Sequence, residues 1–379
     1  MRAFNIFIIL SITIIACQKE ARIAIAIPDQ IVPNDLRLNE IQVLGSHNSY
    51  RLKPDNDILE VLETLQGVLP NSFNIEELDY SHLTLKDQFE KHGIRQIELD
   101  LYQDPTGGLF YNRIGYQFVG KSIQSNEQKL AEPGIKVMHI PDIDFNTHYL
   151  TFIESLQAVK DFSLDFPYHL PITIMLEMKT ETIADYLPGV GFAEAIPWDQ
   201  ASFDNMEAEI LAIFSRDQII KPDDIRNNAN TLKEGLQLNG WPTIENSRGK
   251  VMFVFTNSAS QNSIYKQGAP SLENKLCFTN ANPAEDDAAF LIYNDPFINF
   301  DEIKEKVAEG FLIRTRSDAG TYQARSADYK TWTKAKNSGA QFISTDYYIP
   351  DERYLSSADW TDYSVGFDNG IYQLNPILE

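Results

Sequence analysis

The sequence predicts an α/β protein with a TIM-like (β/α)8 barrel, and two observations support this fold class. Short apolar segments rich in β-branched residues recur along the chain, and each ends in charged or polar residues. Such continuous apolar runs are typical of parallel strands buried on both faces. Helix-like patterns separate several of these runs, and this alternation favours a barrel. An open doubly wound sheet is the alternative, but the Gly-rich phosphate loop expected after its first strand is absent from the sequence.

The predicted strands occupy residues 41–45, 95–101, 135–140, 171–178, 250–256, 288–293, 310–315 and 341–345. The predicted helices occupy residues 57–66, 83–92, 147–162, 204–215, 300–309 and 321–337. The long proline-containing segment 180–249 is predicted to be an elaborated connection with helices of its own. We therefore expect residues 40–379 to form a single barrel domain, whose last thirty residues make a C-terminal strap over the barrel.

The first seventeen residues have the features of a lipoprotein export signal. Arg2 gives a positively charged start, and residues 3–15 form an apolar stretch too short to span a bilayer. The run Ile-Ile-Ala-Cys that ends at Cys17 is similar to a bacterial lipobox. We expect residues 1–17 to be a signal peptide with Cys17 lipidated, and 18–39 to be a tether. An ordinary secretory signal that happens to contain a cysteine is the alternative.

This N-terminus predicts export to the bacterial cell envelope, at the outer membrane or the cell surface, with attachment to the membrane through the lipid anchor. The formal net charge of −22 argues against nucleic acid as a partner, because phosphate contacts require clustered Lys and Arg. The sequence implies no protein partner. Cys277, the other cysteine, is predicted to be a core residue.

The stretch GSHNSY at Gly45–Tyr50 follows the first predicted strand and combines two kinds of chemistry. The His47 imidazole can move protons near pH 7, and the Asn48 amide oxygen can bind a hard cation. Three later strands also end in reactive residues, namely IELD at 97–100, VMH at 137–139 and IMLEMK at 174–179. Because strand C-terminal ends meet at one mouth of a barrel, we expect these residues to lie together.

The acidic residues of these strands predict a metal site. Glu98 and Asp100 are two apart on one strand and point to the same face, and Glu177 adds a third carboxylate. Without a cation, three such carboxylates would repel one another strongly. Together with Asn48 they form an oxygen-only set that suits Ca²⁺ or Mg²⁺ and not zinc. Ca²⁺ is favoured over Mg²⁺ because its loose geometry accepts ligands from separate strands.

Histidines and cationic residues around this cluster predict chemistry on a phosphodiester. His47 and His139 would flank the metal and could act as an acid–base pair. Lys179, Arg314 and Arg316 could supply the positive charge that an anionic phosphate requires. The other four histidines are predicted to be structural. These features together indicate a metal-dependent phosphodiesterase.

The motifs GSHNSY, IELDLY, KVMHI and PITIMLEMK, in this order, resemble the X-region motifs of phosphoinositide-specific phospholipases C. The later segments NGWPTIENSRGKVMFVFTN, GFLIRTRSDAG and SGAQFISTDYY resemble the bacterial calcium-dependent phosphatidylinositol-specific branch of that family. The resemblance runs over residues 41–349 and implies a barrel of the PLC-like phosphodiesterase type. By this resemblance, His47 and His139 match the catalytic histidines, Asn48, Glu98, Asp100 and Glu177 match the calcium ligands, and Lys179 matches a position near the substrate phosphate.

The resemblance implies cleavage of phosphatidylinositol, or a related inositol phospholipid, to diacylglycerol and a cyclic inositol phosphate or inositol phosphate. The assignment of acid and base between the two histidines is open at this stage. Clustered lysines that would hold extra ring phosphates are not evident, which favours an inositol headgroup without them. The alternatives are a glycerophosphodiester phosphodiesterase on the same fold and a non-catalytic surface protein that binds inositol lipids or glycans.

Overall fold

The computed structural model describes residues 32–67, 69, 73–368 and 370–378. The expected signal peptide with Cys17, and residues 18–31 of the expected tether, lie outside these described residues and stay predictions. In the described part of the chain, we find no helix that is long and apolar enough to cross a membrane.

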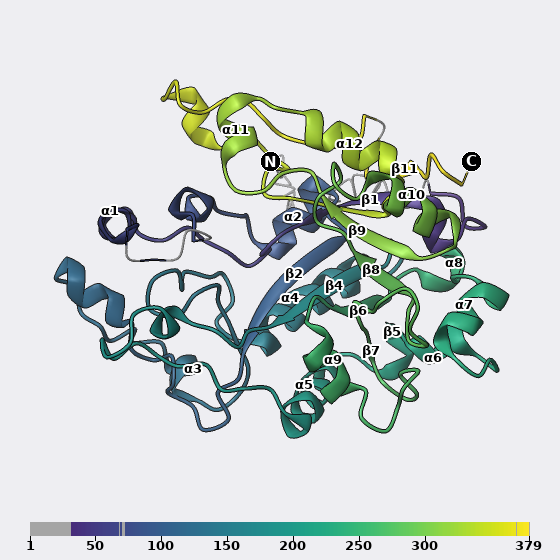
Figure 1. Cartoon of the computed structure of the whole chain (residues 1–379), viewed down its shortest axis with the longest axis horizontal. Helices are drawn as coiled ribbons and strands as arrows, with labels where there is room; N and C mark the ends of the chain where they lie inside the picture. Colours follow the sequence, from purple (N-terminus) through teal and green to yellow (C-terminus); the bar gives the residue numbers. More distant parts are fainter. Residues whose placement is uncertain (1–31, 68, 70–72, 369, 379) are drawn as a thin grey trace, which may run out of the picture.

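Parallel strands curl into a barrel whose order follows the chain (Figure 1). Within the described residues, these strands are β1 (Ile41–Ser46), β2 (Gln96–Tyr102), β4 (Ile172–Met178), β6 (Val251–Phe255), β7 (Cys277–Phe278), β8 (Phe290–Ile292), β9 (Leu312–Arg316) and β10 (Phe342–Thr345). The sheet is closed between β7 and β8 by an isolated parallel bridge that joins Asn280 to Phe290. The predicted α/β fold with a TIM-like barrel is therefore confirmed.

One predicted barrel strand is wrong, and one barrel strand escaped prediction. The segment predicted at 135–140 contains β3 (Lys136–Val137), which pairs antiparallel with β2 and lies outside the barrel order. Its apolar residues are buried in the packing beside the barrel mouth, so the run resembles a barrel strand. β7 is the eighth strand of the barrel instead. It was not predicted because a strand of two residues is too short to show any periodicity. The remaining strands are β5 (Ile219–Ile220), parallel to β6, and β11 (Tyr372–Leu374), antiparallel to β1.

The α-helices are α1 (Asn56–Leu65), α2 (Leu85–His92), α3 (Gln128–Ala131), α4 (Phe152–Asp165), α5 (Gln200–Ile213), α6 (Pro222–Arg226), α7 (Leu232–Asn239), α8 (Ile244–Ser247), α9 (Ala259–Tyr265), α10 (Phe300–Ala308), α11 (Tyr322–Ser326) and α12 (Lys330–Ser338). The 3-10 helices are η2 (Leu38–Glu40), η3 (Ile75–Leu78), η4 (Ile114–Val119), η5 (Ile183–Asp185), η6 (Arg216–Gln218) and η7 (Glu352–Leu355). The predicted helix at 321–337 is divided into α11 and α12, because Ala327 adopts a left-handed conformation with φ of 51°.

Local sequence signals explain several helix ends. α4 begins at a capping box in which Thr151 and Glu154 satisfy each other's backbone N–H groups. α2 ends at Gly93, whose φ of 65° is the left-handed conformation that glycine accepts at no steric cost. These signals explain why the predicted helices at 83–92 and 147–162 lie close to the observed ones.

Segments outside the barrel strands shape the mouth and the floor. The loops after β1, β2 and β4 share a small apolar core that includes Ile58, Ile143 and Phe192, and in Figure 1 α1 and α3 lie to one side of the sheet. At the floor, Val32 and Leu38 are buried. These two residues of the expected tether therefore belong to the core of the barrel. The segment 180–249 contributes β5, which pairs with β6, and several helices.

Candidate active site

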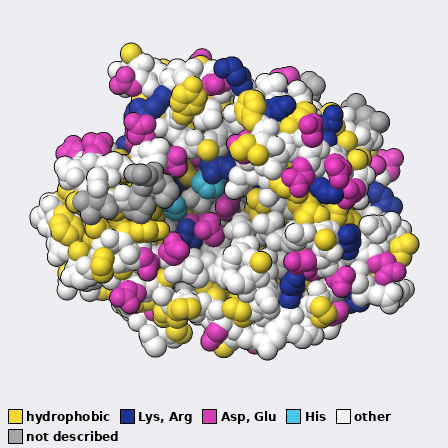
Figure 2. All heavy atoms as spheres, in the orientation of Figure 1, with side chains coloured by type: hydrophobic (Ala, Val, Ile, Leu, Met, Phe, Trp, Pro, Cys, Tyr) yellow, Lys and Arg dark blue, Asp and Glu magenta, His cyan; other side chains and the backbone are white. Residues whose placement is uncertain are grey.

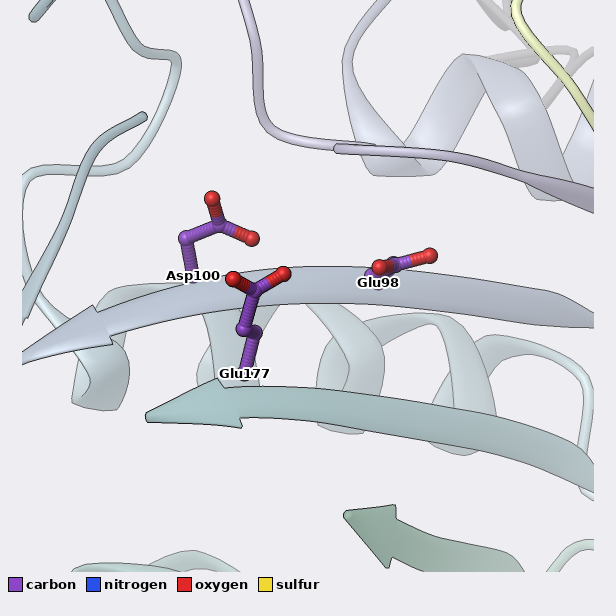
Figure 3. Close-up of side chains that lie close together, drawn as sticks. All are labelled: Glu98, Asp100 and Glu177. Carbon is purple, nitrogen blue, oxygen red and sulfur yellow. The ribbon is translucent and has the colours of Figure 1, made fainter. Parts of the chain in front are cut away.

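Three carboxylates meet at the C-terminal ends of two adjacent strands. Glu98 and Asp100 rise from the same face of β2, and Glu177 rises toward them from β4 (Figure 3). Asp100 and Glu177 are direct register partners in the parallel ladder. One carboxylate oxygen from each of the three residues lies within 4.8 Å of the others. The alternation of side chains along a strand therefore brings together the carboxylates that the sequence predicts.

Some oxygen atoms in this cluster lack the hydrogen bonds that buried polar groups normally make. Asp100 is 1% exposed, and both of its carboxylate oxygens are without a hydrogen bond in the described part of the chain. The buried Asn48 amide oxygen is also unpartnered among these residues. Asn48 sits in a left-handed turn with φ of 47°, and the next N–H, from Ser49, donates to the Glu98 carbonyl oxygen at 2.9 Å. These oxygens suit a hard cation, which would satisfy them.

Two cationic side chains pair with the cluster. The Lys179 ammonium lies 3.0 Å from Glu177 Oε1 and 3.4 Å from Asp100 Oδ2, and Arg314 Nη2 lies 2.7 Å from Glu98 Oε2. Burial raises the pKa of the Asp100 carboxyl well above its ordinary value, against the opposing pull of Lys179. Burial acts the same way on Glu177, but Lys179 together with His139 and His47 outweighs it, and the pKa of Glu177 is lowered.

His47 is held by residues from the two strands that precede β1 around the barrel. Its Nδ1 lies 3.0 Å from Asp346 Oδ1, just beyond β10, and 3.2 Å from Arg316 Nη2 at the end of β9. Arg316 also donates to Asp346 at 3.1 Å. The His82 Nε2 lies 2.6 Å from the His47 carbonyl oxygen and steadies the backbone. These contacts fix the orientation of the His47 ring.

His139 has a similar support, although it lies in the loop after β3 and not at the end of a barrel strand. Its Nδ1 is 2.6 Å from Asp144 Oδ2. Arg51 donates to that same oxygen through Nε at 3.1 Å and Nη2 at 2.6 Å. Burial lowers the pKa of His139 although Asp144 favours its charged form. Both histidines are thus backed by a carboxylate that is itself paired with an arginine.

A polar cavity of about 350 Å³ opens over these groups, and Figure 2 shows histidine, basic and acidic side chains gathered in a hollow of the surface. The charged and titratable residues of its lining include His47, Glu98, Glu177, Lys179, Arg314 and Arg316. The lining also includes Thr180, Glu181, Thr256, Asn257, Ser258, Gln261 and Asn294. The charges of His139 and His47 both help to lower the pKa of Glu177.

Sequence reasoning missed the residues that orient the histidines, namely Asp346, Asp144 and Arg51. Asp346 carried a usable signal, because it follows the predicted strand 341–345 just as the other site residues follow theirs. Arg51 and Asp144 lie in loops, where a single sequence offers no periodicity that would indicate their partners. Each of the nine catalytic, metal and substrate-binding residues predicted from the sequence lies in this site or directly beneath it.

A comparison with protein-family models shows the family to which this chain belongs. The family model described as phosphoinositide phospholipase C, Ca²⁺-dependent, matches residues 36–376, which is most of the chain. The chain belongs to this family. It is therefore a phosphoric diester hydrolase of the phospholipase C type, and the family to which it belongs is calcium-dependent. A comparison with curated proteins finds no match.

Solved structures agree on the fold of this phospholipase C. A calcium-dependent phosphoinositol-specific phospholipase C from Pseudomonas sp. has a TM-score of 0.53 at 14% identity, with 92% of this chain and 99% of that chain covered. A Ca²⁺-dependent phosphatidylinositol-specific phospholipase C from Streptomyces antibioticus has a TM-score of 0.50 at 14% identity, with 83% and 95% covered. At this identity the likeness establishes the barrel fold alone.

Proposed function

We propose that this phospholipase C cleaves phosphatidylinositol, with Ca²⁺ held by Asn48, Glu98, Asp100 and Glu177. The observation that carries the proposal is the cluster of three carboxylates, with Asn48 and Asp100 oxygens that accept no hydrogen bond among the described residues, beside two histidines that are each backed by a carboxylate. The donors are all oxygens and come from separate strands, as calcium accepts. When bound, the ion would supply electrostatic stabilisation of the phosphate and lower the pKa of a coordinated hydroxyl.

The charge of the site supports a dication. Five carboxylates, those of Glu98, Asp100, Glu177, Asp144 and Asp346, face four cationic side chains, those of Lys179, Arg314, Arg316 and Arg51. Glu181 on the cavity lining adds a sixth carboxylate. A dication would neutralise this excess of negative charge and so remove the repulsion that a phosphodiester, which carries one negative charge, would otherwise meet.

The two histidines carry the proton transfers. A headgroup hydroxyl attacks the phosphorus and gives its proton to one imidazole, while the bond from phosphorus to the glycerol oxygen breaks. The other imidazole protonates that departing oxygen, which releases diacylglycerol and leaves a cyclic inositol phosphate. Water can then open the ring with the two roles exchanged. Arg316 and Lys179 lie on the cavity wall, where they can contact the phosphate.

The cavity favours an inositol ring without extra phosphates. Among the described lining residues, the cationic side chains are Lys179, Arg314 and Arg316, and each already pairs with a carboxylate. The lining also offers the hydroxyl groups of Thr180, Thr256 and Ser258, which suit the hydroxyls of a polyol. Glu181 adds a carboxylate to the lining, and it would repel a ring phosphate.

We also propose where this protein acts in the cell, from its N-terminal sequence. The lipobox-like run before Cys17 supports an exported bacterial lipoprotein, anchored in the outer membrane or at the cell surface, that reaches its lipid substrate from there. Labelling of the full chain with a radioactive fatty acid tests this proposal. A Cys17→Ser variant that still incorporates label would contradict it.

The activity itself is tested with residues 18–379 and phosphatidylinositol vesicles, with calcium and then with chelator, and products are followed by phosphorus NMR. We expect calcium-dependent release of a cyclic inositol phosphate. Cleavage of glycerophosphodiesters with phosphatidylinositol untouched would overturn the substrate assignment.

The same assay tests the histidines. His47→Ala and His139→Ala should each lower kcat by about 10²-fold or more, since each removes a general acid or base. His92→Gln serves as the matched control, because His92 lies at the end of α2, outside the cavity lining. Turnover near the wild-type level in both alanine variants would refute the mechanism.

A further inference from the structure

β4, which carries Glu177 and leads directly into Lys179, extends further than β6, the strand with which it pairs. β4 pairs with β6 up to Leu176 and Phe255, and their last main-chain bond runs from the Thr256 N–H to the Leu176 carbonyl oxygen at 3.0 Å. The chain then turns into α9. The backbone of Met178, which lies between Glu177 and Lys179, therefore has no strand residue opposite it on this side.

A side chain takes the place of the missing strand. Asn257 Oδ1 accepts a hydrogen bond from the Met178 N–H at 3.2 Å, and Asn257 Nδ2 donates to the Met178 carbonyl oxygen at 3.1 Å. One amide side chain thus makes both bonds that a backbone partner would make. Asn257 is 8% exposed, so these bonds are largely shielded from water.

A second amide from the first turn of α9 completes the arrangement. Gln261 Nε2 donates to the same Met178 carbonyl oxygen at 2.9 Å, and Gln261 Oε1 accepts from Asn257 Nδ2 at 2.6 Å. On the other side of β4, the Lys179 N–H donates to the Leu101 carbonyl oxygen at 2.9 Å. The backbone that presents Glu177 is therefore held from both sides.

We propose that Asn257, supported by Gln261, is a positioning residue that holds the Met178 backbone so that Glu177 can bind the metal ion. This inference rests on the proposed function, because it takes Glu177 as a calcium ligand. The Glu177 side chain is 38% exposed, against 5% for Glu98 and 1% for Asp100, so it depends most on its backbone for a fixed position. Ligand atoms must be held within a fraction of an ångström for full affinity.

The test measures calcium binding by calorimetry and thermal stability, without substrate, for Asn257→Ala and for Asn262→Ala. Asn262 is the matched control, because it is a buried asparagine on α9 that donates to the Asn280 carbonyl oxygen at 2.9 Å, away from β4. We expect Asn257→Ala to raise the calcium Kd about tenfold, or about 1.4 kcal/mol. Asn262→Ala should lower Tm and leave the calcium Kd unchanged.

A calcium Kd for Asn257→Ala within twofold of wild type would overturn the inference, as would an equal loss in Asn262→Ala. If Asn257→Ala does not fold, Gln261→Ala removes one of the bonds to Met178 and should raise the Kd about threefold; an unchanged Kd there would refute the role. If the wild-type protein binds no calcium, the proposed metal site fails and this inference fails with it. If the wild-type protein binds calcium and neither variant changes the calcium Kd, this inference is refuted while the proposed metal site stands.

Discussion

At the scale of single residues, the oppositely charged side chains of this site lie close together and orient one another. Asp346 lies between His47 and Arg316, and Asp144 lies between His139 and Arg51. Against the effect of burial, Arg51 and His139 lower the pKa of Asp144, and His47 and Arg316 lower the pKa of Asp346. Each carboxylate in turn orients its imidazole. The same principle holds Lys179 against two of the acidic residues of the metal cluster.

Lys179→Met should tighten calcium binding. The ammonium lies against Asp100 and Glu177, so an incoming dication meets a positive charge a few ångströms away, a repulsion of about 2 kcal/mol even at the dielectric constant of water. We expect the calcium Kd to fall about tenfold by calorimetry, and Tm in chelator to fall because two carboxylates lose their partner. Lys306→Met is the control, since Lys306 also bridges two carboxylates but on the exposed face of α10. Weaker calcium binding in Lys179→Met would contradict this reading.

At the scale of elements, the last described strand, β11, pairs with the first strand of the barrel, β1. β11 pairs antiparallel with the first half of β1, and Asn375 follows it with 1% exposure. The Asn375 side chain donates to the carbonyl oxygens of Gly339 at 2.8 Å and Asn39 at 3.1 Å, and it accepts from the Ile377 N–H at 3.1 Å. One side chain therefore ties the C-terminal segment to the ends of η2 and α12.

Asn375→Ala should lower the free energy of unfolding by about 2 kcal/mol, because it leaves buried carbonyl groups without donors. Urea denaturation measures the loss. Turnover at 20 °C should stay at the wild-type level, since the change lies at the floor of the barrel. Asn246→Ala, at an exposed position of α8, is the control and should have little effect. An unchanged urea midpoint in Asn375→Ala would show that these bonds do not stabilise the fold.

At the scale of the whole molecule, buried histidine makes stability depend on pH. Burial lowers the pKa of His82 to about 4, although Asp346 attracts its charged form. In the unfolded chain a histidine has a pKa of about 6.5. Between these two values the unfolded chain binds more protons, so the free energy of unfolding falls as pH falls through this window, by up to about 3 kcal/mol.

We expect the stability measured by urea unfolding to be constant above about pH 7 and to decline toward about pH 4. His82→Gln should flatten part of this decline, because glutamine keeps a donor for the His47 carbonyl oxygen but binds no proton. An equally steep decline in His82→Gln would assign the effect to other groups. Measurements at pH 7.5 and pH 5 in chelator separate this effect from calcium binding.

Much of the site was predictable because it follows from local rules. Strands of parallel barrels end at one mouth, and residues two apart on a strand share a face, so Glu98, Asp100 and Glu177 could be grouped without a structure. Asn48 and His47 belong to a motif at the end of the first strand. The end of α2 at Gly93 could also be predicted, because this signal lies beside the last helical residue, whereas the N-cap of α4 is Thr151, four residues later than the predicted start at 147.

Tertiary structure alone decided the rest. Local sequence did not determine which apolar segment becomes a barrel strand. The segment 135–140 is apolar, yet the barrel uses the short strand β7 in its place. The pairings of Asp346 with His47 and of Asn257 with Met178 join residues 299 and 79 positions apart. Such contacts depend on how the barrel closes. Local sequence patterns are enough to predict the fold class and the residue types of the proposed metal ligands. Which groups hold these ligands in place follows from the closed barrel, because that support comes from residues distant in the chain.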